Sequence, residues 1–480
     1  MRVCLICEGS YPYVAGGVAG WVQTLCKHFR DVEFVIWAIA TTKEEMGEYR
    51  YKIPANVKEI RTIYLGEDRF ASTARQVRLL KPEKEVLKSL ITGRDSPVDW
   101  KEILKFIRKY KHRLVDLLMG EAFFEICLEE YRRSESREAF LPYLWNFRGM
   151  YFPLMNILAG ETVKADLYHA LSTGYAGILG SCASYTEGKP LILSEHGIYT
   201  REREEDIIRS DLLEGGFKEL WIRFFKKIST ITYQQADVVT CLFEVNKTLQ
   251  IELGCPEEKI RLIPNGVSVK EYEDLPVCHK LEKDAFHIAT VLRVVPIKDV
   301  KTMLLAFELV QEQLPKAQLA ILGGFDESTE YYEECQELVR SLDIPNVRFY
   351  GRVKVKEYLP EIDLLLLSSI SEGQPLAMLE GMAAGIPFVS TNVGDCKNLL
   401  EGREGDELGR AGYIVPVMDS EAMAQAILKC ARHPEQLKKM GETGKKRVTL
   451  YYREEDYLEQ YRLLYEKLGG RSRWQESDLS

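Results

Sequence analysis

Features that mark several other classes of protein are missing from this sequence of 480 residues. No apolar run approaches the ~20 residues that a membrane-spanning helix needs, and the apolar stretch 32–40 is short and contains Glu33. The first residues lack the long apolar core of a signal peptide. We therefore expect a cytoplasmic protein whose chain opens with a buried strand. The net charge of −9 argues against general nucleic-acid binding.

Motifs for metals and cofactors are also scarce. Cys4 and Cys7 have a CxxC spacing, but no second CxxC follows. Residues three apart on a strand face opposite sides, so these thiols cannot share a tetrahedral metal. We expect the cysteines to be small buried residues. No Asp-x-Asp follows a predicted strand, and the GxGxxG, GxSxG and Walker sequences are absent. The sequence therefore predicts no metal and no cofactor.

The first half of the chain indicates a parallel sheet. A strand at 3–7, a glycine-rich turn at 9–17, a helix at about 18–29 and a strand at 32–38 form a βαβ start. Further strands are expected at 166–170, 190–193, 238–241 and 260–263. Residues from about 71 to 160 differ, since they are rich in Lys, Glu, Leu and aromatic residues. We predict a helical insertion there, whose charges form a solvated face or a partner surface.

A second α/β series follows a polar linker at 272–284. Its predicted strands are 286–292, 318–322, 347–350, 362–367, 387–390 and 412–415, with helices such as 300–313 and 331–342 between them. Polar amphipathic helices run from 420 to about 468, and the last twelve residues look loose. We predict an α/β protein of two Rossmann-like doubly wound domains facing a central cleft, with a helical insertion in the first. The domains are 1–275 (insertion about 71–160) and 285–455, and a C-terminal helix and tail occupy 456–480.

The most informative segment is 371–387, which follows the apolar run 362–367. It predicts a strand, a polar loop with Glu372, and a helix beginning near Pro375 with Glu380 about a turn and a half inside it. Ligands of α/β folds bind at the carboxyl ends of strands. Carboxylates accept hydrogen bonds and repel phosphate, so this pair is expected to hold hydroxyls of a sugar and a ribose. The backbone amides after Pro375 are free to meet anions, so we expect Gln374, Pro375 and Leu376 to line the site.

Two cations stand at the start of the second series. Arg293 closes its first strand, and Lys298 comes five residues later, where the next helix opens at Asp299. Taken alone, each would be an ordinary surface residue. Positive charge near a helix N-terminus is unfavourable unless an anion is present. Beside the two glutamates, the cations favour a diphosphate site.

Weaker candidates lie elsewhere. Gly16 and Gly17 precede a helix and would let the backbone approach a phosphate or sugar. His196 follows the strand 190–193 and could bond a sugar hydroxyl, although a structural histidine is the simpler interpretation. Tyr350 begins a turn at a strand end that could contact a base or sugar through backbone atoms.

These residues resemble the retaining nucleotide-sugar glycosyltransferases of family 4, which have the GT-B fold. The E-x7-E at Glu372 and Glu380 carries the likeness, together with the Arg293 and Lys298 pair, the turn 263–267 and the N-terminal glycine loop. The likeness spans most of the chain except 71–160. Residues 7–18 and 194–203, and the helical insertion, also look like the cytoplasmic glycosyltransferases of Pel-type exopolysaccharide biosynthesis.

The resemblance implies a role for each position. Glu372 would contact the donor hexose and Glu380 the ribose. Arg293 and Lys298 would neutralise the leaving diphosphate without a metal. His196 would bond the hexose, and Gly17 would let its loop close on the phosphates. Family members often carry Gly-Phe-Gly after the first Glu, whereas Gly373-Gln374-Pro375 stands here, which puts the local phosphate contacts in question.

The implied activity is retaining transfer of a hexose from a UDP-sugar to a growing exopolysaccharide, by front-face attack. The implied partners are a polysaccharide acceptor and membrane proteins of a synthase complex, with recruitment to the inner face of the membrane. A sugar-nucleotide epimerase or a phosphorylase of the same fold is one alternative. A non-catalytic UDP-sugar-binding scaffold is the other, since the insertion offers ample partner surface.

Overall fold

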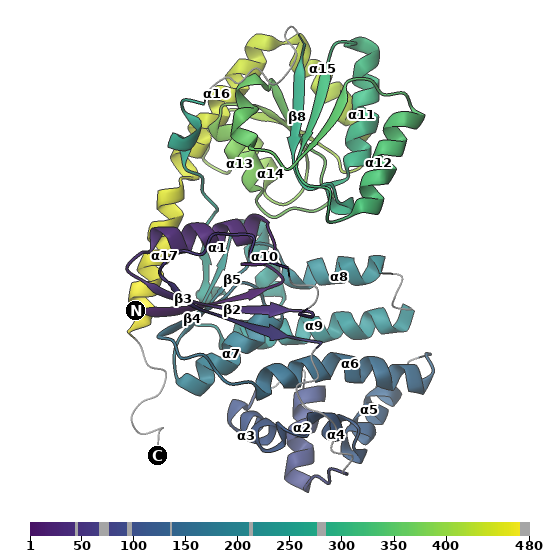
Figure 1. The fold of residues 1–480 in the computed structure, drawn as a ribbon, viewed down its shortest axis with the longest axis vertical. Coiled ribbons are helices and arrows are strands. Elements are labelled where there is room, and N and C mark those ends of the chain that lie inside the picture. Colours follow the sequence, from purple (N-terminus) through teal and green to yellow (C-terminus); the bar gives the residue numbers. More distant parts are fainter. Residues whose placement is uncertain are drawn as a thin grey trace. The chain divides into compact units, whose positions relative to one another are not determined.

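The computed structural model describes residues 1–43, 47–66, 76–93, 98–134, 137–210, 215–275 and 285–470. The chain divides into two compact units (Figure 1). Unit 1 contains Met1–Leu262 together with the segment from Tyr461 onward, and unit 2 contains Ile263–Gln460. The predicted boundaries were 275, 285 and 455, so the division falls earlier, and the last helix is shared between the units. The predicted loose tail lies outside the described residues from 471 on.

Unit 1 is built on a parallel seven-stranded sheet with the order β3-β2-β1-β4-β5-β6-β7. The strands are β1 (Arg2–Glu8), β2 (Glu33–Ala40), β3 (Val57–Tyr64), β4 (Leu167–Ala170), β5 (Leu191–Ser194), β6 (Val238–Cys241) and β7 (Ile260–Leu262). Sequence reasoning missed β3 because charged residues interrupt its apolar ones. Its place at the sheet edge, with one neighbouring strand and only one fully buried residue, explains this composition.

The predicted helical insertion is present. The helices of unit 1 are α1 (Gly17–His28), α2 (Lys81–Thr92), α3 (Trp100–Tyr110), α4 (Leu114–Leu118), α5 (Glu121–Arg133), α6 (Phe140–Ala159), α7 (Tyr175–Glu187), α8 (Tyr199–Arg209), α9 (Gly215–Gln235) and α10 (Glu244–Glu252). Helices α2–α6 form the insertion. One continuous core joins it to the sheet layer, from Trp37 on β2 to Phe147 on α6 and Phe224 on α9. The insertion is therefore part of the body of unit 1.

Unit 2 contains a parallel six-stranded sheet with the order β10-β9-β8-β11-β12-β13. The strands are β8 (His287–Val291), β9 (Gln318–Leu322), β10 (Val347–Gly351), β11 (Leu364–Leu367), β12 (Phe388–Thr391) and β13 (Gly412–Val415). The helices are α11 (Val300–Gln313), α12 (Thr329–Ser341), α13 (Leu376–Ala383), α14 (Cys396–Glu401), α15 (Ser420–Arg432) and α16 (Pro434–Tyr451), followed by α17 (Glu454–Gly469). Both sheets have the doubly wound order, so the predicted α/β fold class is confirmed.

The strand order of unit 2 fixes where a ligand is expected. The chain runs outward from β8 to β9 and β10 on one side, then returns to β11 beside β8 and runs outward on the other. The register pairs Leu364 with Ile288 and Leu365 with Ala289. Open α/β sheets bind ligands outside the carboxyl ends of the strands at such a reversal. The loops that follow β8 and β11 carry Arg293, Lys298 and Glu372, and the helix after the second loop, α13, carries Glu380.

The described cysteines are all free and buried. Cys4 and Cys7 both lie inside β1, the strand at which the order of the first sheet reverses. Burial raises the pKa of the Cys7 thiol well above its usual range. Their expected role as small buried residues is confirmed. Over the described ranges, no helix is both long and apolar enough to cross a bilayer, and no cluster of metal-ligating side chains occurs.

Candidate active site

Lys298 and Glu372 meet at the reversal point of unit 2. Lys298 ends a short 3₁₀ turn, Pro296–Lys298, between β8 and α11, and Asp299 caps α11 by accepting from the Thr302 amide at 3.3 Å. The Lys298 ammonium pairs with a carboxylate oxygen of Glu372. Ser369 Oγ donates to the same oxygen at 2.7 Å. The two side chains are only 18% and 12% exposed, so the pair is held in a partly desolvated place.

Two hydrogen bonds to backbone carbonyls connect the loops that carry this pair. The Ile370 amide donates to the Ile297 carbonyl at 2.9 Å. Ser368 Oγ donates to the Lys298 carbonyl at 2.8 Å. The start of the loop after β11 is therefore bonded to the turn after β8. The predicted convergence of Lys298 and Glu372 follows from this arrangement.

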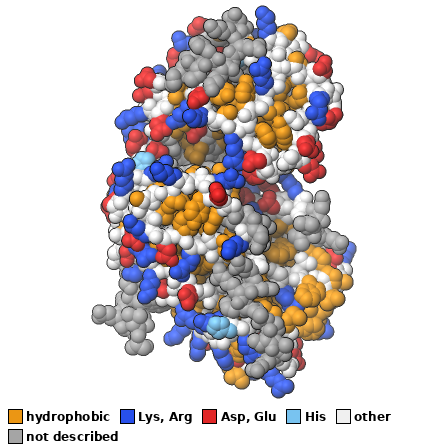
Figure 2. Space-filling model, viewed as in Figure 1, with side chains coloured by type: hydrophobic (Ala, Val, Ile, Leu, Met, Phe, Trp, Pro, Cys, Tyr) orange, Lys and Arg blue, Asp and Glu red, His pale blue; other side chains and the backbone are white. Residues whose placement is uncertain are grey.

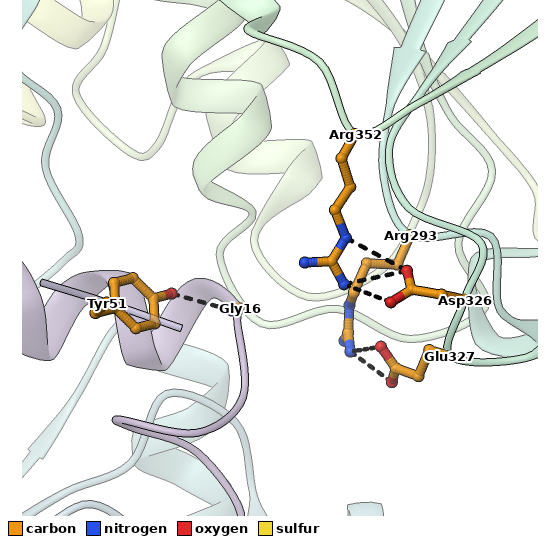
Figure 3. Close-up of polar contacts among 6 residues, drawn as sticks. All are labelled: Gly16, Tyr51, Arg293, Asp326, Glu327 and Arg352. Atoms are coloured by element: carbon orange, nitrogen blue, oxygen red, sulfur yellow. Dashed lines mark hydrogen bonds and ion pairs between the residues drawn. The ribbon is translucent and has the colours of Figure 1, made fainter. Parts of the chain in front are cut away.

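Arg293 has a different partner. Its guanidinium donates to both carboxylate oxygens of Glu327 at 2.6 Å, and the neighbouring Arg352 pairs with Asp326 at 2.9 Å (Figure 3). The Arg293 and Glu327 side chains are 43% and 49% exposed. Ion pairs this exposed contribute roughly 0–1 kcal/mol. Arg293 can therefore exchange this partner for another anion at little cost.

A glycine turn brings these acids to Arg293. Gly323 follows β9 with φ of 154°, and a Cβ atom there would stand 1.6 Å from the Leu292 carbonyl oxygen. Only glycine allows the β9–α12 loop to pass so close to the end of β8. Asp326 and Glu327 follow within this loop. Sequence reasoning did not single them out, and their signal was two adjacent acids one residue after the Gly323-Gly324 pair.

Glu380 lies in the first turn and a half of α13, as predicted, and is half-buried. Burial raises the pKa of its carboxyl, whereas Lys356 and a hydrogen bond from Tyr272 oppose that shift. The Lys356 ammonium stands 4.5 Å from the centre of the Tyr272 ring and pairs with Glu271. Tyr272 lies in the stretch predicted to be a linker, so sequence reasoning missed it. In the structure Tyr272 is the last residue of a 3₁₀ turn, Val269–Tyr272, which ends where the predicted linker begins.

Gln374 uses its amide to hold the loop. Its Oε1 accepts from the Asn265 amide at 2.7 Å, and its Nε2 donates to Asp395 Oδ2 at 2.7 Å. The Gln374 side chain is buried. Pro375 then serves as the N-terminal cap residue of α13, and Leu376 is its first helical residue. The backbone amides at this helix start precede the first intrahelical bond, so they are available to an anion.

Gly394 and Asp395 support the same loop from β12. Gly394 has φ of 51°, and a Cβ atom there would stand 2.1 Å from the Gly373 carbonyl oxygen. The Asp395 amide donates to that oxygen at 2.9 Å. Burial raises the pKa of Asp395 to about 6, although bonds from Gln374 and Asn398 oppose the shift. A close backbone contact and a buried carboxylate thus fix the segment that bears Glu372.

Tyr350 lies on the edge strand β10. Its ring contacts that of Tyr358 edge to face, with centroids 5.2 Å apart. Over the described residues, no hydrogen bond joins Tyr350 to Glu372 or Glu380. Its expected contact with a base through backbone atoms remains a prediction.

The unit 1 candidates are His196, Gly16 and Gly17. His196 follows β5 and meets Trp21 edge to face at 4.9 Å. Its Nε2 is buried and has no hydrogen-bond partner among the described residues. Burial lowers the pKa of His196 to about 4, so the imidazole is neutral at pH 7. Gly17 begins α1, and the Gly16 amide donates to the Tyr51 hydroxyl at 3.3 Å (Figure 3).

Two families match this chain. Residues 1–258 match the family described as domain of unknown function (DUF3492), which is more than half of the chain. The chain belongs to the DUF3492 family. Residues 273–447 match the family described as glycosyl transferases group 1. That second domain contains Arg293, Lys298, Glu372 and Glu380.

Curated relatives are similar to part of this DUF3492 chain. It is 29% identical over 244 residues to N-acetyl-alpha-D-glucosaminyl L-malate synthase of Bacillus anthracis, covering 48% of this chain and 60% of the relative. It is 27% identical over 200 residues to the amylovoran biosynthesis glycosyltransferase AmsK of Erwinia amylovora, covering 38% and 44%. The chain therefore spans less than two thirds of the length of these relatives.

Solved structures resemble the whole DUF3492 chain in fold. Sucrose-phosphate synthase from Thermosynechococcus elongatus has a TM-score of 0.62 at 16% identity, covering 97% of this chain and 98% of the other. Anabaena HepE in complex with UDP-glucose has a TM-score of 0.61 at 13% identity, covering 98% and 100%. These similarities and the two doubly wound sheets establish the GT-B fold.

Proposed function

We propose that this protein transfers a hexose from a UDP-sugar to a growing exopolysaccharide, with retention at the anomeric carbon and without a metal. The Lys298–Glu372 pair at the reversal point of unit 2 is the observation that carries the proposal. It places a cation and a hydroxyl acceptor together, inside a domain that matches glycosyl transferases group 1. AmsK and HepE support a polysaccharide product and a UDP-sugar donor through their names. The likeness of 7–18 and 194–203 to Pel-type enzymes favours a Pel-type polymer.

The donor is proposed to bind along the loops after β8 and β11. Departure of UDP from the anomeric carbon builds negative charge on the diphosphate. Lys298 and Arg293 can stabilise this charge, because fixed cations need no reorganisation when the charge develops. Arg293 would leave Glu327, and this exchange costs little for an exposed pair. The amides that open α13 add hydrogen-bond donors to the same anion.

The acids are proposed to hold hydroxyls. Glu372 would accept from the hexose and orient it as it becomes oxocarbenium-like. Glu380 would accept from the ribose, and its bond to Tyr272 holds it in place. Transfer proceeds by front-face attack, in which the departing phosphate helps to deprotonate the acceptor. The roles that the resemblance implies for His196 and Gly17 remain predictions.

The experiment is a panel of donors assayed for UDP release and for product. UDP-glucose, UDP-galactose and their N-acetylated forms would each be incubated with and without an oligosaccharide acceptor. We expect release that depends on the acceptor and that is abolished by Glu372→Ala. Glu334→Ala is a matched control, because Glu334 also pairs with a lysine but is exposed and lies on α12.

Other outcomes separate the alternatives. Conversion of the UDP-sugar without an acceptor would identify an epimerase, and dependence on orthophosphate would identify a phosphorylase. Donor binding without turnover, even with acceptor and membrane partners, would favour a scaffold. Near-normal turnover by Glu372→Ala would remove that residue from the site and refute the proposal.

A further inference from the structure

The helical insertion of unit 1 exposes a strip of large apolar side chains. The strip consists of Met119, Phe124, Leu141 and Trp145, which are 57%, 42%, 63% and 55% exposed. Figure 2 shows hydrophobic side chains gathered on the surface where Figure 1 places α5 and α6. Single exposed apolar residues are ordinary, but several within one small subdomain are typical of an interaction surface.

Contacts join the members of the strip. Leu141 and Trp145 are four residues apart on α6, so they lie on one face of that helix. The Arg148 guanidinium lies 4.7 Å from the centre of the Trp145 ring. It also donates to the Leu118 carbonyl, next to Met119, at 2.9 Å.

Phe124 completes the strip from α5. Its ring meets that of Phe140 at 5.4 Å, and Phe140 is the neighbour of Leu141. The strip is therefore a connected surface formed by α5, α6 and the end of α4.

A basic segment adjoins the strip. Residues 100–113 contain a single acidic residue, Glu102, and six lysine and arginine residues: Lys101, Lys105, Arg108, Lys109, Lys111 and Arg113. Only α4 separates Arg113 from Met119, and its five residues span ~7.5 Å.

Ion pairs involve both acids beside the strip and cations of the basic segment, in which Lys105 pairs with Glu102, Lys109 with Glu83 and Arg113 with Asp116. On α5, Glu125 and Glu129 pair with Lys84 and Lys88 of α2. Lys101, Arg108 and Lys111 carry the remaining positive charge of the segment, on a chain whose net charge is −9.

We propose that this surface rests on an anionic lipid bilayer. The four apolar side chains would enter the headgroup region, where tryptophan is favoured, and the cations of 100–113 would face the lipid phosphates. Both the apolar strip and the cations are required, because apolar burial and electrostatic attraction to anionic lipid together determine the strength of such binding. A bilayer adapts to side chains of unequal reach, whereas a protein partner needs a complementary groove. This inference does not depend on the proposed transferase activity.

Vesicle co-sedimentation of the full chain tests the proposal. The vesicles would be pure phosphatidylcholine, or phosphatidylcholine with about 30% phosphatidylglycerol, each at about 50 mM and about 300 mM salt. We expect binding to the anionic vesicles at low salt, and at least about tenfold weaker binding at high salt or without phosphatidylglycerol. The double variant Leu141→Ser/Trp145→Ser is expected to lose most of this binding.

Controls keep the result interpretable. Leu450→Ser is the matched control, because Leu450 is 57% exposed on α16 of unit 2, and it should bind like the wild type. The double variant Lys101→Glu/Lys105→Glu leaves the strip intact and should also weaken binding, so a fold defect caused by losing Trp145 cannot mimic the result. Absence of binding to the anionic vesicles at low salt would overturn the proposal and leave an acidic protein as the partner. Equal binding by wild type and both double variants would also overturn it.

Discussion

Replacing Gln374 by alanine tests how the glutamate-bearing loop is held. The Gln374 side chain satisfies the buried Asn265 amide and donates to the buried Asp395 carboxylate. The variant would leave one buried donor and one buried acceptor without these partners. Each such loss costs about 1–3 kcal/mol, so we expect about 2–6 kcal/mol in total. For a domain the size of unit 2, this lowers the melting temperature by roughly 4–24 °C.

The assay is thermal and urea unfolding without ligand, followed by donor kinetics at a temperature where the variant is folded. Gln313→Ala is the control, because Gln313 is an exposed acceptor for Arg432, and it should shift stability by less than about 0.5 kcal/mol. We expect donor KM to rise in Gln374→Ala, since the loop also carries Glu372. A melting temperature within about 1 °C of the wild type would refute the view that Gln374 holds this loop.

Three further predictions concern single side chains of unit 2. Tyr272→Phe keeps the ring beneath Lys356 but removes the bond to Glu380, so donor KM should rise about 5–30-fold with kcat little changed; an unchanged KM would contradict this role. Glu327→Ala removes the anion that competes for Arg293 and should lower the donor KM a few-fold, whereas Arg293→Ala should raise the donor KM. A higher KM for Glu327→Ala together with a lower KM for Arg293→Ala would argue against a contact between Arg293 and phosphate. The pKa of Asp395 is about 6 in the folded protein and about 4 in the unfolded chain. Between these pH values the native state binds more protons than the unfolded state. The free energy of unfolding therefore falls as the pH rises from about 4 to about 6. Asp395→Asn should therefore gain up to about 3 kcal/mol of stability relative to the wild type between pH 4.5 and 7, measured by urea unfolding.

Most of the strands and helices could be predicted from the pattern of apolar residues in the sequence. Strand after strand of unit 2 appears where the apolar runs predicted it, because a central parallel strand is buried on both faces and reads as a continuous apolar run. The edge strand β3 was not predicted, because it is partly exposed to solvent and its sequence includes the charged residues Glu59 and Arg61. The division between the units was placed too late because the polar stretch 272–284 was taken as the linker, whereas the second unit begins at Ile263.

The site was foreseen only in part. The spacing of Glu372 after β11 and of Lys298 after β8 sufficed to predict that they meet, because neighbouring parallel strands end at one edge. The partners of Arg293 and Glu380 were not foreseen. Glu327 reaches Arg293 through a turn that only the folded backbone reveals, and Tyr272 reaches Glu380 across a distance of more than a hundred residues in sequence. Contacts between such remote segments leave no periodic signal in a single sequence.

Ligand-induced thermal shift is the measurement that tests the central claim most directly. UDP, UDP-glucose, GDP and GDP-mannose would be added to the wild type and to Glu380→Ala. At a concentration about 100 times the dissociation constant, a ligand that binds only the folded state stabilises it by about 2.7 kcal/mol, which raises the melting temperature by roughly 5–10 °C. We predict such a shift for UDP and UDP-glucose with the wild type, a much smaller one with Glu380→Ala, and little effect of the GDP compounds. A larger shift with GDP, or an equal UDP shift in both proteins, would contradict the account.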